Sequence, residues 1–171
     1  MKRLPMLVLV MAGLFATANT ARSEIFQATL TGYEEVPSVS STGTGLLYAS
    51  SDSPDSIFYS LYITKMQGTV TQAHIHIAQP GVNGSIVIWL CQTATNVDPT
   101  GGSPQCPQDG SVTGTITAAN VIAGSQPGQQ LAAGDIKAAL TALRAGAAYA
   151  NVHTNLSTGG EIRGQIRVIS K

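Results

Sequence analysis

The sequence alternates between short runs rich in Val, Ile, Thr, Tyr and Phe and clusters of Gly, Pro, Ser and Asn. β-Branched and aromatic side chains fit a pleated sheet, whereas Gly, Pro and Asn favour turns, so this spacing predicts an all-β domain. About eight short strands at such intervals are typical of an antiparallel β-sandwich or Greek-key barrel. The predicted strands are residues 25–30, 43–50, 56–63, 70–77, 85–91, 111–117, 147–153 and 161–169.

One segment, residues 135–145, departs from the strand pattern and predicts one short helix. Asp135 at its start can accept hydrogen bonds from the first backbone N–H groups, and Gly146 after it suits the left-handed conformation that ends many helices. A helix of about three turns is marginal alone, so we expect it to pack over an open end of the sheet. Its apolar stripe, spaced as one helical face, consists of Ile136, Leu140 and Leu143.

The N-terminus has the pattern of a signal peptide over residues 1–18. Lys2 and Arg3 precede an apolar stretch, and Ala18 ends a small-residue cleavage site, with Ala21 as a later one. The apolar stretch is shorter than the ~20 residues of a spanning helix, which argues against the alternative of a retained membrane anchor. We therefore expect a secreted or periplasmic protein that has no membrane span once the signal is removed.

The remaining chain, residues 24–171, has the length of a single domain. After residue 18 the sequence holds seven basic and nine acidic residues, and none of the basic residues form a run. This charge pattern argues against nucleic acid and anionic membrane surfaces as partners.

Cys91 and Cys106 are the two cysteines of the chain. In an exported protein an even number of cysteines favours a disulfide. The bond would close a loop of about 16 residues and stabilise the fold by about 3 kcal/mol if its effect is chain entropy. A thiolate metal site shared with the histidines is the alternative.

All three histidines lie in two strand-like segments: His74 and His76 in one, His153 in the other. Residues two positions apart on a strand point to the same face, about 6–7 Å apart. Two imidazoles placed in this way can bind one metal ion through bonds of about 2 Å if a neighbouring strand supplies a third ligand. Ala73 and Ile75 form the opposite, apolar face, so we expect the histidines to point away from the aliphatic core.

Copper and zinc are the metals that three imidazoles favour. The Irving–Williams order favours Cu(II), while three histidines with an open position also fit zinc, so both remain candidates. Two other interpretations stay open: a hydrogen-bonded structural cluster of histidines, and a catalytic acid–base pair.

Glu161 is a weaker candidate for the fourth ligand. It follows a glycine-rich turn after the His153 strand, so a hairpin can bring it back beside the site. A salt bridge with Arg163, or a hydrogen bond that fixes the backbone, is the simpler role for this carboxylate. Glu34 and Glu35 are looser candidates.

Six short motifs follow one another along the chain: residues 26–32 (FQATLTG), 35–37 (EVP), 73–76 (AHIH), 81–84 (GVNG), 151–154 (NVHT) and 160–165 (GEIRGQ). In this order they resemble the CHRD domain, a module named for chordin that also forms stand-alone exported bacterial proteins. Related domains in chordin belong to an extracellular protein that binds growth factors, whereas the bacterial members supply no established activity that the resemblance could carry over. Ser38 stands where a second proline is commoner.

The leading hypothesis is an exported, non-catalytic module that buffers or delivers copper or zinc. An extracellular protein-interaction or adhesion module with structural histidines is the alternative, and a metal-dependent enzyme ranks third. The chain has no Gly-x-Ser-x-Gly motif, and we predict no catalytic residue.

Overall fold

The computed structural model describes residues 23–170 and confirms the predicted all-β class. All strand pairings are antiparallel. Single turns of 3-10 helix lie at Gly32–Glu34, Ala118–Asn120 and Pro127–Gln129. The strands are β1 (Glu24–Thr31), β2 (Thr44–Ser53), β3 (Ser56–Thr64), β4 (Val70–Ile77), β5 (Ser85–Cys91), β6 (Gly110–Thr117), β7 (Ala148–Thr154), β8 (Ile162–Gln165) and β9 (Arg167–Ser170).

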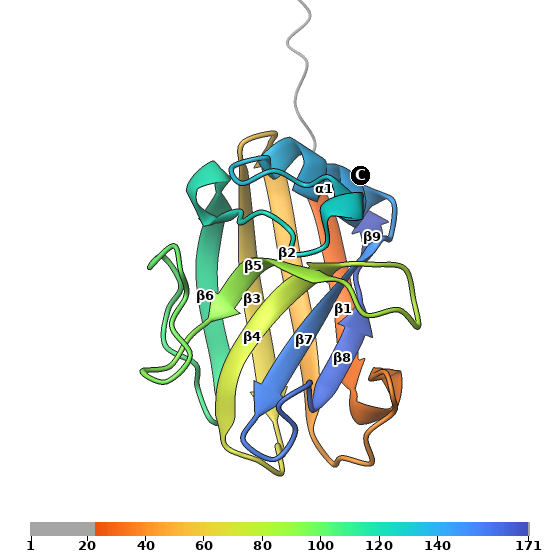
Figure 1. Cartoon of the computed structure of the whole chain (residues 1–171), viewed down its shortest axis with the longest axis vertical. Helices are drawn as coiled ribbons and strands as arrows, with labels where there is room; N and C mark the ends of the chain where they lie inside the picture. The colour runs from red at the N-terminus through yellow and green to blue at the C-terminus, as the bar shows by residue number, and fades with distance from the viewer. Residues whose placement is uncertain (1–22, 171) are drawn as a thin grey trace, which may run out of the picture.

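The sheet nearly closes into a barrel. Its strand order is β5-β4-β7-β8-β1-β2-β3-β6, and β9 also pairs with β1. The two ends of this order, β5 and β6, lie close to each other. In Figure 1 the strands β5, β4, β7 and β8 form the front half of the barrel, and β1, β2, β3 and β6 form the back half.

The predicted strand over residues 161–169 is in fact two strands, β8 and β9. The backbone N–H of Ile166, between them, donates to the carbonyl oxygen of Ala148 in β7 at 2.9 Å. Beyond this residue the chain pairs with β1 alone, in a register that places Val168 opposite Phe26. Alternation of apolar residues continues through the break, so the sequence pattern gave no signal of it.

The inner faces of both halves form one apolar core. Leu47, Leu61, Ile75 and Val152 are fully buried there. Tyr59 links the halves, because its hydroxyl donates to the carbonyl oxygen of Leu90 at 2.6 Å. Burial of these side chains supplies the main driving force for folding.

The predicted helix is confirmed as α1 (Ile136–Arg144), which covers one end of the barrel (Figure 1). Asp135 caps it by accepting a hydrogen bond from the Ala138 backbone at 2.9 Å. Gly146 follows with a positive φ of 66°, as expected for the residue that ends the helix. The buried stripe includes the predicted Ile136, Leu140 and Leu143.

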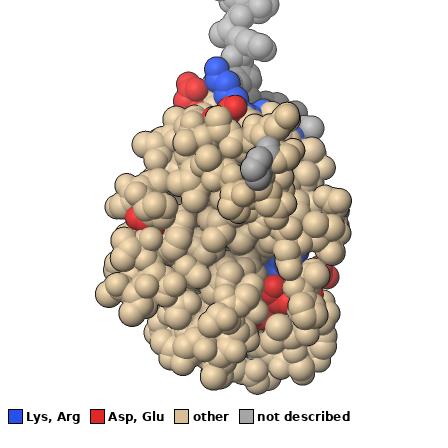
Figure 2. Space-filling view, in the orientation of Figure 1, with Lys and Arg blue, Asp and Glu red and all other residues tan. Residues whose placement is uncertain are grey.

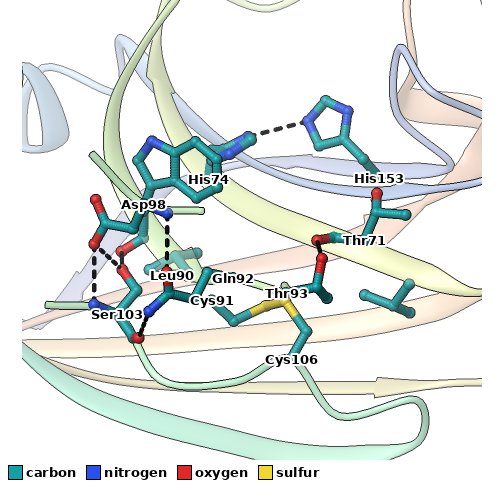
Figure 3. Close-up of a disulfide and its surroundings, with 12 residues drawn as sticks. Thr71, His74, Leu90, Cys91, Gln92, Thr93, Asp98, Ser103, Cys106 and His153 are labelled. Atoms are coloured by element: carbon teal, nitrogen blue, oxygen red, sulfur yellow. Dashed lines mark hydrogen bonds between the residues drawn. A yellow bond between two sulfur atoms is a disulfide. The ribbon is translucent and has the colours of Figure 1, made fainter. Parts of the chain in front are cut away.

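The predicted disulfide is also confirmed, with an S–S distance of 2.00 Å between Cys91 and Cys106. Figure 3 shows it joining the end of β5 to the long loop before β6. Among the described residues, no helix is both long and apolar enough to cross a bilayer. The predicted signal peptide, residues 1–18, lies outside the described residues.

Candidate metal centre

The structure brings the three predicted histidines together on the outer face of the front half. His74 and His76 come from β4, and His153 comes from the neighbouring strand β7. One ring nitrogen from each can be chosen so that all three lie within 4.8 Å of one another. Figure 3 shows His74 and His153 turned toward each other. The strand spacing that predicted this cluster therefore led to the right three side chains.

The histidines point away from the apolar core, as expected, yet they are buried. His74 is 0% exposed, and His76 and His153 are 7% and 6% exposed. Two loops, residues 82–84 and 157–160, contact this outer face and take hydrogen bonds from its side chains. The front half of the barrel is consequently buried on both faces.

Two backbone carbonyls fix the tautomers of His76 and His153. Nδ1 of His76 lies 3.0 Å from the oxygen of Gly84, and Nδ1 of His153 lies 2.9 Å from the oxygen of Thr158. A carbonyl oxygen only accepts, so both Nδ1 atoms carry the hydrogen and both Nε2 atoms present a lone pair. Metal-binding histidines are commonly oriented by this kind of bond.

The same reasoning determines which ring nitrogen of His74 carries the hydrogen. Its Nδ1 lies 3.2 Å from Nε2 of His153, which carries no hydrogen, so Nδ1 of His74 is the donor. Nε2 of His74 then also presents a lone pair. The Nε2 atoms of His74 and His76 are buried and have no hydrogen-bond partner among the described residues. Two of the three lone pairs, on His74 and His76, are therefore unpartnered, and the third, on His153, accepts the hydrogen from His74.

Burial keeps all three imidazoles neutral. Loss of hydration lowers the pKa of His74 to about 2, with His153 and His76 adding to the effect. Loss of hydration also lowers the pKa of His76 to about 4, although its bond to Gly84 opposes the shift. The pKa of His153 falls for the same reason, opposed by its bond to Thr158. A metal needs the neutral form, so no proton competes for these sites near neutral pH.

The spacing of the rings suits one metal ion. With bonds of about 2 Å and tetrahedral angles, two bound nitrogens lie about 3.3 Å apart. Nδ1 of His74 and Nε2 of His153 are 3.2 Å apart. An ion bound between these two atoms would replace their mutual hydrogen bond, and His74 would then carry its hydrogen on Nε2 instead of Nδ1.

Aromatic side chains enclose the cluster. Trp89 of β5 meets His74 edge-on, with ring centroids 4.3 Å apart. Tyr149 of β7 stacks on His76 at 4.6 Å with only 5° between the planes. These contacts restrict the orientation of two of the three imidazoles.

Arg163 of β8 contacts both the Tyr149 ring and the loop that contains Gly84. Its guanidinium lies 3.4 Å above the centre of the Tyr149 ring. It donates to the Val82 oxygen at 2.7 Å and to Oδ1 of Asn83 at 3.0 Å, next to the carbonyl that holds His76. Only 2% of Arg163 is exposed, whereas the sequence pattern placed it on a polar face.

Glu161 lies outside the histidine cluster, and its carboxylate is engaged by two backbone and two hydroxyl donors. It accepts hydrogen bonds from the N–H groups of Gln67 and Gly68 and from the hydroxyls of Ser41 and Thr154. Burial opposes ionisation, yet these four bonds hold the pKa of Glu161 below its usual range. The predicted salt bridge to Arg163 does not form; the other predicted role, fixing the backbone, does. Ligation by Glu161 stays a prediction without geometric support.

Glu35, in the sequence only a looser candidate for the fourth ligand, is not part of the histidine cluster. It is buried and accepts a 2.6 Å hydrogen bond from the side-chain amide of Asn151, which pairs with His74 across β4 and β7. Burial raises the pKa of Glu35 to about 7, although the nearby Arg163 charge and the hydrogen bonds from Asn151 and the Val36 backbone oppose the shift. A perturbed carboxyl beside a cleft is a candidate functional group.

A family model described as the CHRD domain matches residues 26–166 of the chain. The match covers nearly the whole described structure, and the protein therefore belongs to the CHRD domain family. Comparisons with curated proteins and with solved structures found no match.

Proposed function

We propose that this CHRD-domain protein binds Cu(II) or Zn(II) through His74, His76 and His153, as an exported module that holds a metal. The observation that supports this proposal is the convergence of three buried, neutral imidazoles, with one ring nitrogen from each within 4.8 Å of the others. Their Nδ1 hydrogens are already engaged, two by carbonyls and one by a partner histidine.

The energetic cost of the metal-free cluster supports the same proposal. Burying a polar nitrogen without a partner costs about 1–3 kcal/mol. Two such nitrogens, on His74 and His76, lie within one cluster. A single ion would satisfy several lone pairs at once, so the cluster makes more sense as a binding site than as a structural network.

Metal storage or transfer fits this burial better than catalysis. The exposed atoms of the cluster amount to 7% or less of each histidine, which leaves little room for a substrate beside the ion. The signal-peptide pattern and the disulfide support export, where copper and zinc would be met. Buffering or delivery of the metal is the function we propose.

Titration of the metal-free protein with Cu²⁺ and Zn²⁺ tests the proposal. Trp89 is the one tryptophan of the chain and lies beside His74, so bound Cu²⁺ should quench its fluorescence. We expect wild-type binding with 1:1 stoichiometry, and binding weakened at least 100-fold in His76→Ala. At metal concentrations 100-fold above Kd, binding should add about 2.7 kcal/mol to the free energy of unfolding. Equally weak binding by both proteins would contradict the proposal.

A second candidate function is protein interaction, and the outer face of the back half supports it. Four apolar or aromatic side chains there are 36–47% exposed. Substituting them should abolish partner binding and leave metal affinity unchanged if this face is the interaction surface. These side chains are Leu46 and Tyr48 of β2 and Phe58 and Tyr62 of β3.

A further inference from the structure

We propose that the metal ion reaches the buried histidines through a pocket beside Glu35, and that the Glu35 carboxylate binds the cation on its way in. The inference rests on the proposed function, and it explains how an ion can enter a cluster whose ligand atoms are shielded from solvent. Glu35 is in this view an entry residue, distinct from the three histidines that hold the ion.

The pocket is a cleft of about 250 Å³ between three loops. A water molecule occupies about 30 Å³ in the liquid, so an ion with six waters needs roughly 200 Å³. The cleft can therefore admit a hydrated divalent ion. Its lining includes Glu35, Val36, Pro37, Asn83, Ser157 and Gly159.

Two walls of the pocket are the loops that orient the histidines. Asn83 lines the pocket, and the next residue, Gly84, accepts the hydrogen of His76. Ser157 and Gly159 line it too and flank Thr158, which accepts the hydrogen of His153. A small outward shift of either loop would open the cluster toward the pocket. The pocket therefore lies next to the loops that orient His76 and His153, the two candidate ligands that would capture the ion.

Glu35 gives this pocket its attraction for cations. The residue is only 7% exposed, and its carboxyl pairs through one oxygen with the amide of Asn151 and forms no ion pair within the described residues. The nearest buried cation, Arg163, is held by Val82 and Asn83 above the Tyr149 ring. Burial raises the pKa of Glu35, so an arriving cation would displace a proton rather than break a salt bridge. Figure 2 shows acidic atoms at the lower right of this face of the molecule, with basic atoms beside them.

Two adjacent glycines set the shape of the pocket in different ways. A side chain at Gly160 would meet the amide of Asn151 and the carboxyl of Glu35 within 2.5 Å, so glycine there permits their contact. A Cβ at Gly159 would meet nothing within 4 Å. Position 159 lines the pocket, so a large side chain there can reach into it, and its Cβ would meet no wall atom.

The first test measures Cu²⁺ association and dissociation rates by stopped-flow quenching of Trp89 fluorescence. In Glu35→Gln we expect both rates to fall about tenfold, the lower range for electrostatic focusing of an ion, with Kd unchanged. A residue on the entry path lowers the free-energy barrier for both binding and release, so its loss slows both rates equally. Loss of a ligand would change Kd instead. Glutamine can still accept the Asn151 hydrogen bond, which protects the fold. The matched control is Glu34→Gln, an exposed neighbouring carboxylate that does not line this pocket.

The second test fills the pocket with Gly159→Phe, which should slow association at least tenfold at unchanged Kd. Gly128→Phe is its control, because a side chain there also meets nothing within 4 Å and lies outside the pocket. Wild-type rates in both Glu35→Gln and Gly159→Phe would overturn the entry route while leaving the histidine site intact. A higher Kd with unchanged association in Glu35→Gln would overturn it by making Glu35 a ligand. Weak binding by the wild type would instead refute the proposed function.

Discussion

The two halves of the barrel share one apolar core and differ in their outer faces. In the back half, β2 alternates between buried residues and exposed ones such as Leu46 and Tyr48. In the front half, all seven residues of β7 are buried. The back half has the ordinary form of an antiparallel sheet, solvated on one side. The front half carries a second, polar core beneath its covering loops.

The difference shows where specificity is built in this fold. Inner-face residues need only be apolar and of suitable volume. Each polar group of the outer core needs a particular partner, because an unpaired buried polar group is costly. His153 donates a hydrogen bond to Thr158, Asn151 donates one to Glu35, and Glu161 accepts from four donors. The lone pairs on His74 and His76 and the indole N–H of Trp89 beside them have no partner among the described residues, and the two lone pairs mark the candidate site.

The largest effect on stability should come from the inner face. Ile75 lies between the two histidines of β4 but points into the core, where it is fully buried. Ile75→Ala should lower the free energy of unfolding by about 2–5 kcal/mol, measured by urea denaturation. Leu46→Ala, at an exposed position of the back half, should change it by less than about 0.5 kcal/mol. Similar losses in both variants would erase the distinction between the two faces.

Acid should weaken the front half through its outer core. The histidines have lowered pKa values in the folded protein, about 2 for His74 and about 4 for His76. Their stabilising effect is complete above the unfolded pKa of 6.5 and is lost as pH falls, because the unfolded chain then binds protons that the folded protein cannot. At pH 5 each of these two histidines should cost up to about 2 kcal/mol, at 1.36 kcal/mol per pH unit.

Glu35 has the opposite effect over the same range. Its pKa is raised from 4.5 to about 7, so it stabilises the folded state increasingly as pH falls between these values. The metal-free protein should therefore lose a net 1–3 kcal/mol or so between pH 7 and 5, and Glu35→Gln should lose more. Urea denaturation at the two pH values measures both losses. A flat profile in Glu35→Gln would show that the buried histidines do not resist protonation.

The fold could be predicted from sequence because its core is formed by every second residue of each strand. The alternation in Val70–Ile77 placed Ile75 inside and His74 and His76 together on the other face, and both assignments are correct. The division of the last predicted strand at Ile166 was not predicted, because the alternation of apolar residues does not show with which strand a segment pairs.

The surroundings of the cluster could not be predicted in the same way. Glu35 and Arg163 reach it from segments distant in sequence, and only the packing of loops over the sheet determines which polar groups meet. Sequence spacing records neighbours along one strand. It found the three histidines and gave Glu35, Asn151 and Arg163 only as possible neighbours of the site, without the contacts that the packing creates between them.

The smallest predicted effect concerns the hydroxyl of Tyr149, which Tyr149→Phe removes while the ring is kept. The hydroxyl accepts a hydrogen bond from the Gly84 N–H at 3.2 Å, and the carbonyl of Gly84 orients His76. Tyr149→Phe keeps the ring on His76 but leaves this partly buried N–H without its partner, so stability should fall by about 1 kcal/mol. Metal affinity should fall up to about tenfold, the lower end for groups that orient a ligand.

Tyr62→Phe is the matched control in the back half, where the tyrosine ring is 44% exposed. It should change neither quantity measurably, because an exposed hydroxyl is hydrogen-bonded to water in both the folded and the unfolded state. If Tyr149→Phe behaved like Tyr62→Phe in both assays, the loop at Gly84 would not depend on the outer core for its position. The orientation of His76 would then come from ring stacking alone, and the two faces of the barrel would differ in burial without differing in how strictly they specify a structure.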